Sequence, residues 1–149
     1  MVTMQLPADF RDFLRLLNDH EVEYLLVGGY AVAYHGYPRT TLDMDVWVSN
    51  DAANADRMVR VMKDFGFTGS ISPEIFRMTD RVVRMGVPPM KLEIIMEASG
   101  VDFGECFANR VTDTIDDIAV NIISLQDLRR NKKASGRHKD LDDLEHLPE

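Results

Sequence analysis

The sequence predicts a single α+β domain in which helices flank a mixed β-sheet. Three observations predict it. Apolar residues recur at helical spacing near the start of the chain, over 49–66 and near the end. Short apolar and β-branched runs, typical of strands, lie between these segments. The chain has 149 residues, enough for one hydrophobic core, so we expect one domain over residues 1–149.

The first half of the chain is predicted to alternate helices and strands. The predicted helices, which begin after a proline or a capping residue or end at a glycine, are 7–20, 30–36 and 49–66. The predicted strands are 22–29 and 41–48. Ser49 or Asn50 is the expected cap of the third helix, and Gly66 is its expected stop.

The second half is predicted to carry four strands and three helices. The strands are 74–78, 81–87, 90–96 and 117–124, and we expect the first two to pair with each other. The helices are 100–111, 124–133 and 136–147, the last two closing the fold. In the final helix Leu141, Leu144 and Leu147 recur at three-residue spacing.

The charge and the apolar pattern limit the expected partners. A formal net charge of -8 argues against nonspecific binding of nucleic acid, which depends on clustered lysine and arginine. Residues 129–139 nevertheless hold six of the 17 basic residues and no carboxylate, which fits an anion site or a solvated charged face. The sequence lacks an apolar run near the ~20 residues of a bilayer helix, so we expect a cytoplasmic protein with no membrane partner. Cys106, the only cysteine, is expected to be a packing thiol.

Two aspartates alternate along the predicted strand 41–48. Side chains two residues apart point to the same face of a strand, so Asp43 and Asp45 are expected to be neighbours. Their negative charges repel each other unless a cation lies between them, and a hard divalent ion such as Mg²⁺ prefers carboxylate oxygens. The alternative is a pair of solvated acids, or acids bound to Arg39.

Two glycines stand where a predicted strand gives way to a helix. Gly28 and Gly29 leave bare backbone N–H groups at a helix start, a place that suits a phosphate. If the strands on either side of this helix are neighbours, the glycines and the aspartates share one edge of the sheet. A metal-bound triphosphate would then bridge them. The alternative is that the glycine pair only makes a tight turn.

These residues resemble a known family. VGGYAVAYHGYPRTTLDMDV, residues 27–46, resembles the signature of the nucleotidyltransferase superfamily related to DNA polymerase β. NKKASGRHKDLDDLEHL, residues 131–147, is similar to the C-terminal segment of its small, stand-alone bacterial and archaeal members. The resemblance extends from about Val22 to Leu147 and implies the nucleotidyltransferase fold.

The resemblance also implies roles for individual residues. A third carboxylate on a later strand joins the aspartate pair in active members, and Glu93 stands at that place, where aspartate is more common. Asp43, Asp45 and Glu93 would be the catalytic and metal-binding residues, holding Mg²⁺ or Mn²⁺. The residues implied to bind the nucleotide are Gly28, Gly29, Arg39, Lys132, Arg137 and Lys139.

Two other residues near the motif have simpler explanations. His35 is expected to be a core or capping histidine rather than a catalytic base. Trp47 shares a face with the aspartates, but we expect it to pack under a helix rather than to stack on a base. Lys132, in the C-terminal segment, also has an alternative explanation. A cation near a helix end often complements the helix dipole.

The implied activity is metal-dependent transfer of a nucleoside monophosphate from a nucleoside triphosphate to a hydroxyl on protein, RNA or a small molecule. Two other interpretations stay open: a non-catalytic module that binds a nucleotide or a partner, and one component of a toxin–antitoxin or phage-defence pair. A chain of 149 residues leaves no room for a separate acceptor domain. We therefore expect the acceptor to be held by the C-terminal tail, by a second copy in a homo-oligomer, or by a partner protein.

Overall fold

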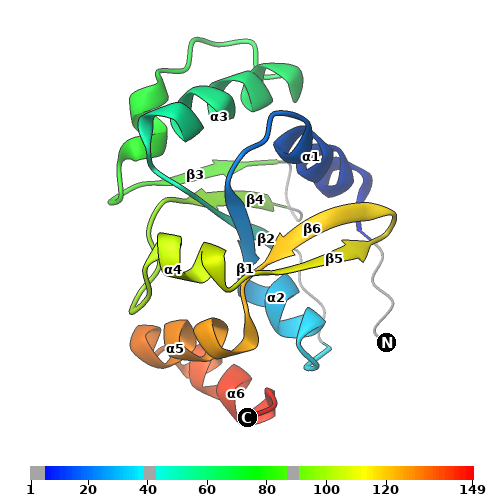
Figure 1. Ribbon diagram of the computed structural model, residues 1–149, viewed down its shortest axis with the longest axis vertical. Helices are drawn as coiled ribbons and strands as arrows, with labels where there is room; N and C mark the ends of the chain where they lie inside the picture. Colours follow the sequence, from blue (N-terminus) through cyan, green and yellow to red (C-terminus); the bar gives the residue numbers. More distant parts are fainter. Residues whose placement is uncertain (1–5, 39–42, 87–90) are drawn as a thin grey trace.

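The computed structural model describes residues 6–38, 43–86 and 91–149, which form one six-stranded sheet with helices around it (Figure 1). The strands are β1 (Tyr24–Val27), β2 (Asp43–Val48), β3 (Val82–Met85), β4 (Lys91–Ile95), β5 (Val111–Ile115) and β6 (Ile118–Ile122). The helices are α1 (Ala8–Asp19), α2 (Gly28–Tyr34), α3 (Ala52–Asp64), the 3-10 helix η1 (Pro73–Arg77), α4 (Phe103–Ala108), α5 (Leu125–Ser135) and α6 (His138–His146). The predicted α+β class and the two closing helices are confirmed.

The sheet is mixed, and β2 lies inside it. The strand order is β3-β4-β2-β1-β6-β5. β2 is antiparallel to β1 and parallel to β4, and these pairings put Val27 and Glu93 on either side of Asp45. Because neighbouring strands bond to β2 along both edges, the positions of its side chains are fixed by the sheet.

Helices cover both faces of the sheet. α1 and α3 lie together on one side, and α4, α5 and α6 lie on the other (Figure 1). The ring of Phe13 in α1 meets that of Phe65, the residue after α3, edge to face with centroids 5.3 Å apart. On the other side, the buried Trp47 ring meets Phe103 of α4 edge to face at 5.2 Å. The prediction that Trp47 packs under a helix is therefore confirmed.

One predicted strand is wrong. Residues 74–78 do not pair with 81–87 but contribute most of η1, which starts at Pro73 and is capped by the hydroxyl of Ser72, which accepts from the Glu74 N–H. Only Phe76 of this segment is fully buried, so the segment has a single anchor. β3 instead pairs antiparallel with β4.

One strand was missed. β5 pairs antiparallel with β6 across a tight turn in which Asp116 and Asp117 both have positive φ, 51° and 66°. Two consecutive residues with positive φ define the turn that best matches the twist of a hairpin. Aspartate tolerates this conformation better than most residues. β5 was missed because it is largely exposed and has little apolar pattern.

Two helix starts differ from the prediction. α3 is capped by Asp51, whose Oδ1 accepts from the Asn54 N–H at 2.8 Å, instead of by Ser49 or Asn50. α2 begins at Gly28, two residues earlier than predicted. Among the helices in the described part of the chain, none combines the length and apolar character needed to cross a membrane.

Candidate nucleotide-transfer site

Three carboxylates meet on one face of the sheet. Asp43 and Asp45 alternate on β2, and Glu93 on β4 pairs directly with Asp45. All three line a cavity of about 440 Å³, together with Gly28 at the start of α2. The sheet register therefore brings together the residues that the sequence pattern and the family resemblance selected.

The carboxylate of Asp45 is strongly affected by its surroundings. Burial raises its pKa most, the negative charges of Glu93 and Asp43 raise it further, and the positive charge of Lys139 lowers it, with a result of about 6. Such a carboxylate is stabilised by an additional positive charge. A site of this kind has the electrostatic character that attracts a cation.

Gly28 is required by the carboxylate beside it. Its φ is +66°, and a Cβ atom at this position would overlap Oδ2 of Asp45 and lie 2.9 Å from its Cγ. The close approach of Asp45 therefore explains Gly28 without any ligand. Gly29 follows as a buried residue of α2. The phosphate-binding roles of both glycines stay predictions.

Arg84 is a site residue that the sequence reasoning missed. It lies on β3 directly opposite Glu93, and its Nε is 3.1 Å from Oε1 of Glu93. The Arg84 side chain is 65% exposed and lines the same cavity. Arg84 reaches Glu93 because β3 pairs with β4. The sequence pattern instead predicts that residues 81–87 pair with residues 74–78.

The donor set fits a hard divalent cation in its chemistry. Carboxylate oxygens are the preferred protein ligands of Mg²⁺ and Mn²⁺. Burial is the main cause of the raised pKa of Asp45, and the negative charges of Glu93 and Asp43 contribute to it. Among the described residues, no group of three or more His, Cys, Asp or Glu side chains is already gathered in metal-binding geometry. Glu93 contacts Arg84 through Oε1, so a cation at this carboxylate would compete with the Arg84 charge.

Lys132 was expected to bind the nucleotide and is placed in a buried ion-pair cluster. Its Nζ lies 3.1 Å from Oδ1 of Asp140 and 3.1 Å from Oδ2 of Asp143, and all three side chains are at most 4% exposed. Asp140 also accepts from the hydroxyl of Ser135 at 2.6 Å. These contacts join α5 to α6, which gives Lys132 a structural role. Lys132 also lines the cavity of the three carboxylates, and its role in nucleotide binding stays a prediction.

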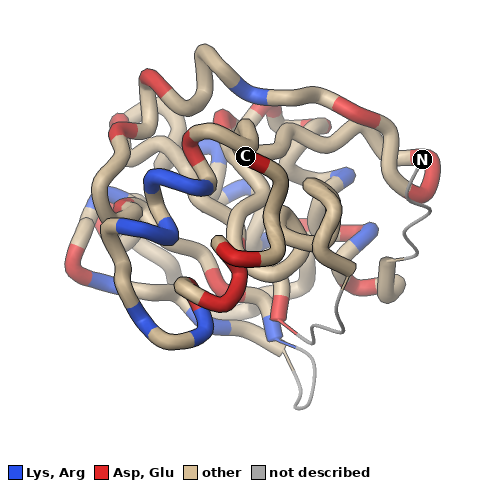
Figure 2. Tube along the Cα trace, turned by 90° about the horizontal axis from the view of Figure 1, so that it is seen from below, with Lys and Arg blue, Asp and Glu red and all other residues tan. Residues whose placement is uncertain are grey.

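Of the predicted cations, Lys132, Arg137 and Lys139 line the cavity, and Arg137 and Lys139 are the two that are exposed. The pKa of Arg137 is raised, mainly by its hydrogen bond to Asp140 and also by the negative charges of Asp45 and Glu93. Lys139, at the start of α6, is exposed and lines the cavity. Figure 2, seen from below, shows both basic and acidic segments along the trace. Positive charge at the cavity therefore comes from a few placed side chains.

The remaining predicted residues are accounted for as follows. Arg39 lies outside the described residues. His35 caps the C-terminus of α2, and its Nε2 is 2.7 Å from the carbonyl oxygen of Ile123, which confirms the capping role. Cys106 is buried, which confirms that it is a packing thiol.

Comparison with known proteins identifies the family. Residues 9–147 match the model of the family described as aminoglycoside-2''-adenylyltransferase. The chain belongs to this family. Its matched region includes all three carboxylates and the two closing helices. No curated protein sequence matches the chain.

Similarity to solved structures shows that this chain has the nucleotidyltransferase fold. A candidate nucleotidyltransferase from Thermotoga maritima is 16% identical, with a TM-score of 0.61 over 91% of this chain and 88% of the other. The lincosamide antibiotic adenylyltransferase LnuA, solved with lincomycin bound, is 14% identical, with a TM-score of 0.61 over 95% and 96%. An antigenic nucleotidyltransferase-like protein from Paracoccidioides brasiliensis is 20% identical, with a TM-score of 0.56 over 92% and 72%. The predicted fold is confirmed.

Proposed function

We propose that this protein transfers a nucleoside monophosphate from a nucleoside triphosphate to a hydroxyl of a small molecule, in a reaction that depends on Mg²⁺ or Mn²⁺. The observation that carries the proposal is the convergence of Asp43, Asp45 and Glu93 in one cavity that Arg137 and Lys139 also line. The family and LnuA, whose names specify antibiotics as acceptors, support a small-molecule acceptor.

The carboxylates would hold the metal. Asp43 and Asp45 lie on the same face of the strand, and Glu93, which contacts Arg84 through Oε1 and pairs with Asp45 across the sheet, would join them. When bound, the metal supplies positive charge that neutralises the phosphates and polarises the reacting oxygens. Arg137 and Lys139 add positive charge on the α6 side of the cavity, where a triphosphate needs it.

The transfer needs orientation and one proton acceptor. The acceptor oxygen forms a bond to the α-phosphorus while the bond from that phosphorus to the pyrophosphate oxygen breaks. The hydroxyl proton passes to a carboxylate of the cavity, for which we assign Glu93, and pyrophosphate leaves. The sheet pairs Glu93 with Asp45, so the backbone positions of these two residues are fixed relative to each other.

A labelling experiment tests the proposal. Each α-labelled nucleoside triphosphate is incubated with the protein, Mg²⁺ or Mn²⁺, and an aminoglycoside, lincomycin, or protein and RNA from a lysate. The variant Asp43→Asn/Asp45→Asn is compared with Asp56→Asn/Asp80→Asn, which removes the same charge from two exposed positions. We expect label in a small molecule with the wild type and the exposed-site variant only.

The outcomes separate the alternatives. Transfer that survives in Asp43→Asn/Asp45→Asn contradicts the assigned site. Label in RNA or protein overturns the small-molecule acceptor. If no label appears, calorimetry of nucleotide binding decides: affinity lost in Asp43→Asn/Asp45→Asn identifies a non-catalytic nucleotide-binding module.

The expectation of a second copy or a partner protein stays a prediction. Light scattering of the purified chain measures its oligomeric state. Co-purification from the native host tests for a partner, including the antitoxin or defence partner that the sequence analysis left open.

A further inference from the structure

Arg137 is held at the cavity of the three carboxylates by a buried partner. Its Nε donates to Oδ2 of Asp140 at 2.8 Å, although the Arg137 side chain is 69% exposed and that of Asp140 only 1%. Both residues line the cavity. Because this bond uses Nε, it leaves the two Nη groups of the guanidinium to other partners, and such a pair of N–H donors matches two oxygens of a phosphate.

Asp140 is itself fixed by two further donors. Its Oδ1 accepts from Nζ of Lys132 at 3.1 Å, and its Oδ2 accepts from the hydroxyl of Ser135 at 2.6 Å. Burial alone would raise the pKa of Asp140, but the hydrogen bonds from Arg137, Ser135 and Lys132 hold this pKa well below its usual range. The carboxylate that holds Arg137 therefore stays charged and keeps one orientation.

The Arg137 guanidinium also lies within electrostatic range of the proposed metal ligands. The hydrogen bond to Asp140 raises the pKa of Arg137 most, and the negative charges of Asp45 and Glu93 raise it further. All four residues line one cavity. The structure thus places a positive charge of fixed position in the same cavity as the carboxylates that would hold the metal.

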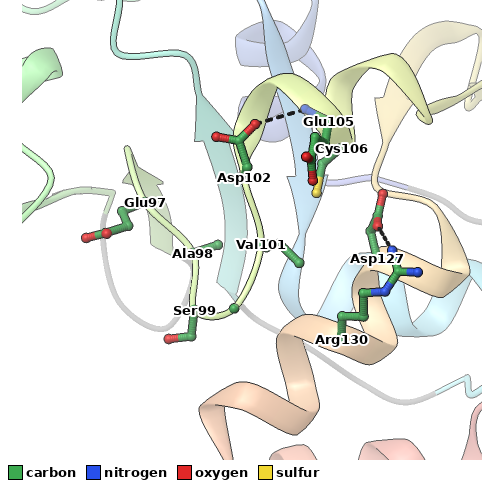
Figure 3. A pocket seen from close by; sticks show the side chains of 10 residues that line it. Glu97, Ala98, Ser99, Val101, Asp102, Glu105, Cys106, Asp127 and Arg130 are labelled. Carbon is green, nitrogen blue, oxygen red and sulfur yellow. Dashed lines mark hydrogen bonds and ion pairs between the residues drawn. The ribbon is translucent and has the colours of Figure 1, made fainter.

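Two other arginines near the site are held differently. Arg84 also contacts a carboxylate through Nε, but that partner, Glu93, is 25% exposed and belongs to the proposed metal site. Arg130 of α5 contacts Oδ1 of Asp127 through Nη1 at 2.9 Å, and both line an adjacent cavity (Figure 3). Of these three arginines, Arg137 is the one whose partner is buried, lies outside the proposed metal site and is bonded through Nε.

We propose that Asp140 is a positioning residue, which orients the guanidinium of Arg137 so that its two Nη groups bind oxygens of the triphosphate. The inference rests on the proposed function, in which a nucleoside triphosphate is the substrate. A planar guanidinium fixed at Nε binds two oxygens in a defined orientation, which an ammonium group on a flexible chain does not. Fixing it in advance reduces the entropy lost on binding. Asp140 acts through Arg137 and does not touch the phosphates.

The sign of the effect separates positioning from general electrostatics. Asp140 is negatively charged and lines the cavity, so removing its charge should strengthen the binding of a triphosphate if only Coulomb forces matter. If Asp140 positions Arg137, the same change weakens binding. A purely structural role would lower the melting temperature and leave the affinity of the folded protein unchanged.

Calorimetry with inorganic tripolyphosphate and Mg²⁺ tests the proposal without the transfer reaction. The variants are Asp140→Ala, the charge-conserving Arg137→Lys and the control Asp143→Ala, which removes another buried carboxylate from the same Lys132. We expect the Kd for tripolyphosphate to rise at least about fivefold in the first two variants, because each loses charge-assisted hydrogen bonds. In the control it should stay within about twofold of wild type, or fall, because the bond from Arg137 to Asp140 remains.

A double mutant distinguishes positioning from damage to the fold. Once Arg137→Ala has removed the guanidinium, Asp140 has nothing to orient. Asp140→Ala should then weaken tripolyphosphate binding no further, while it still lowers the melting temperature. Thermal melting accompanies each measurement, and Arg137→Lys, at an exposed position, decides the test if Asp140→Ala does not fold.

Four results would overturn the inference. The first is a Kd that falls in Asp140→Ala, which would show that the residue acts through its charge alone. The second is an unchanged Kd in Arg137→Lys, which would show that positive charge is sufficient. The third is an equal rise in Asp140→Ala and Asp143→Ala, which would assign the effect to helix packing. The fourth is no binding of tripolyphosphate by the wild type.

The same variants separate this inference from the proposed function. Tripolyphosphate binding that follows the expected pattern, with no label transferred to any acceptor, supports the positioning role and contradicts the transferase. Transfer whose KM for the nucleoside triphosphate is the same in wild type and Asp140→Ala contradicts the positioning role and supports the transferase.

Discussion

A side chain at position 28 would occupy the space of the Asp45 carboxylate. A Cβ atom on Gly28 would overlap Oδ2 and lie 2.9 Å from Cγ of Asp45, and the φ of Gly28 is +66°. The first residue of α2 and the central aspartate of β2 are therefore packed against each other. The glycine in the family motif has a steric reason that is independent of phosphate binding.

Gly28→Ala should cost more stability than an alanine at another glycine with positive φ. The control is Gly66→Ala, at φ +108° with no atom within 4 Å of the added Cβ. We expect the control to lose about 1 kcal/mol from backbone strain, and Gly28→Ala to lose about 1–3 kcal/mol more because Asp45 must move. Urea denaturation measures both. Equal losses would show that Asp45 moves aside at no cost.

Lys132→Met should destabilise the fold. It leaves the buried carboxylates of Asp140 and Asp143 without the ammonium group between them, which costs about 3–5 kcal/mol. Lys133→Met, at the next and exposed position, should change the free energy of unfolding by at most about 0.5 kcal/mol. Chemical denaturation compares the two. A stable Lys132→Met variant with weak nucleotide binding would assign Lys132 to the phosphates instead.

Arg84→Ala should strengthen metal binding. The ion pair with Glu93 is largely exposed on the arginine side, so its loss should change stability by at most about 1 kcal/mol. Glu93 is then free to bind a cation, and the affinity for Mn²⁺, measured by electron paramagnetic resonance, should rise. Arg81→Ala, which removes the same charge from an exposed position just before β3, controls for general electrostatics. An equal rise in both variants would show that Arg84 does not compete for Glu93.

His35 should make the protein less stable as pH falls below 6.5. Burial lowers the pKa of His35, although the hydrogen bond to the Ile123 carbonyl opposes the shift. Below its usual pKa of 6.5 the unfolded chain therefore binds a proton that the folded protein does not, and stability decreases with decreasing pH. Urea denaturation at pH 7.5 and pH 5.0 should show a smaller difference for His35→Gln than for wild type. An unchanged difference would mean that His35 titrates alike in both states.

The closing helix shows what the sequence can and cannot predict. The leucine spacing predicts a helix over residues 136–147, and the structure has α6 over His138–His146. Leu141 is nevertheless 46% exposed, while Asp140 and Asp143 are buried. Hydrophobic spacing assigns the apolar side to the core. In α6 the aspartates Asp140 and Asp143 can be buried because Lys132 of α5 lies between them. The packing of α5 on α6 is needed to recognise this partner.

The candidate site also has residues that the sequence predicts and residues that it does not. Strand periodicity is sufficient to place Asp43 and Asp45 on one face, because it depends only on local geometry. Glu93 was identified from the family resemblance, and the sheet confirms that it lies beside Asp45. Arg84 could not be found from the sequence because it reaches Glu93 across a pairing of β3 with β4. Residue types predict local arrangement well, whereas contacts between distant strands require the register.

A cavity of about 670 Å³ shares a wall with the cavity that the three carboxylates line, and this has a thermodynamic consequence. β4 carries Glu93 and ends at Ile95, two residues before the wall formed by Glu97, Ala98 and Ser99. A ligand that fills one cavity and displaces this short segment would change the shape of the other cavity. Two ligands, one in each cavity, should therefore bind with heterotropic cooperativity, each changing the affinity of the other by the same factor.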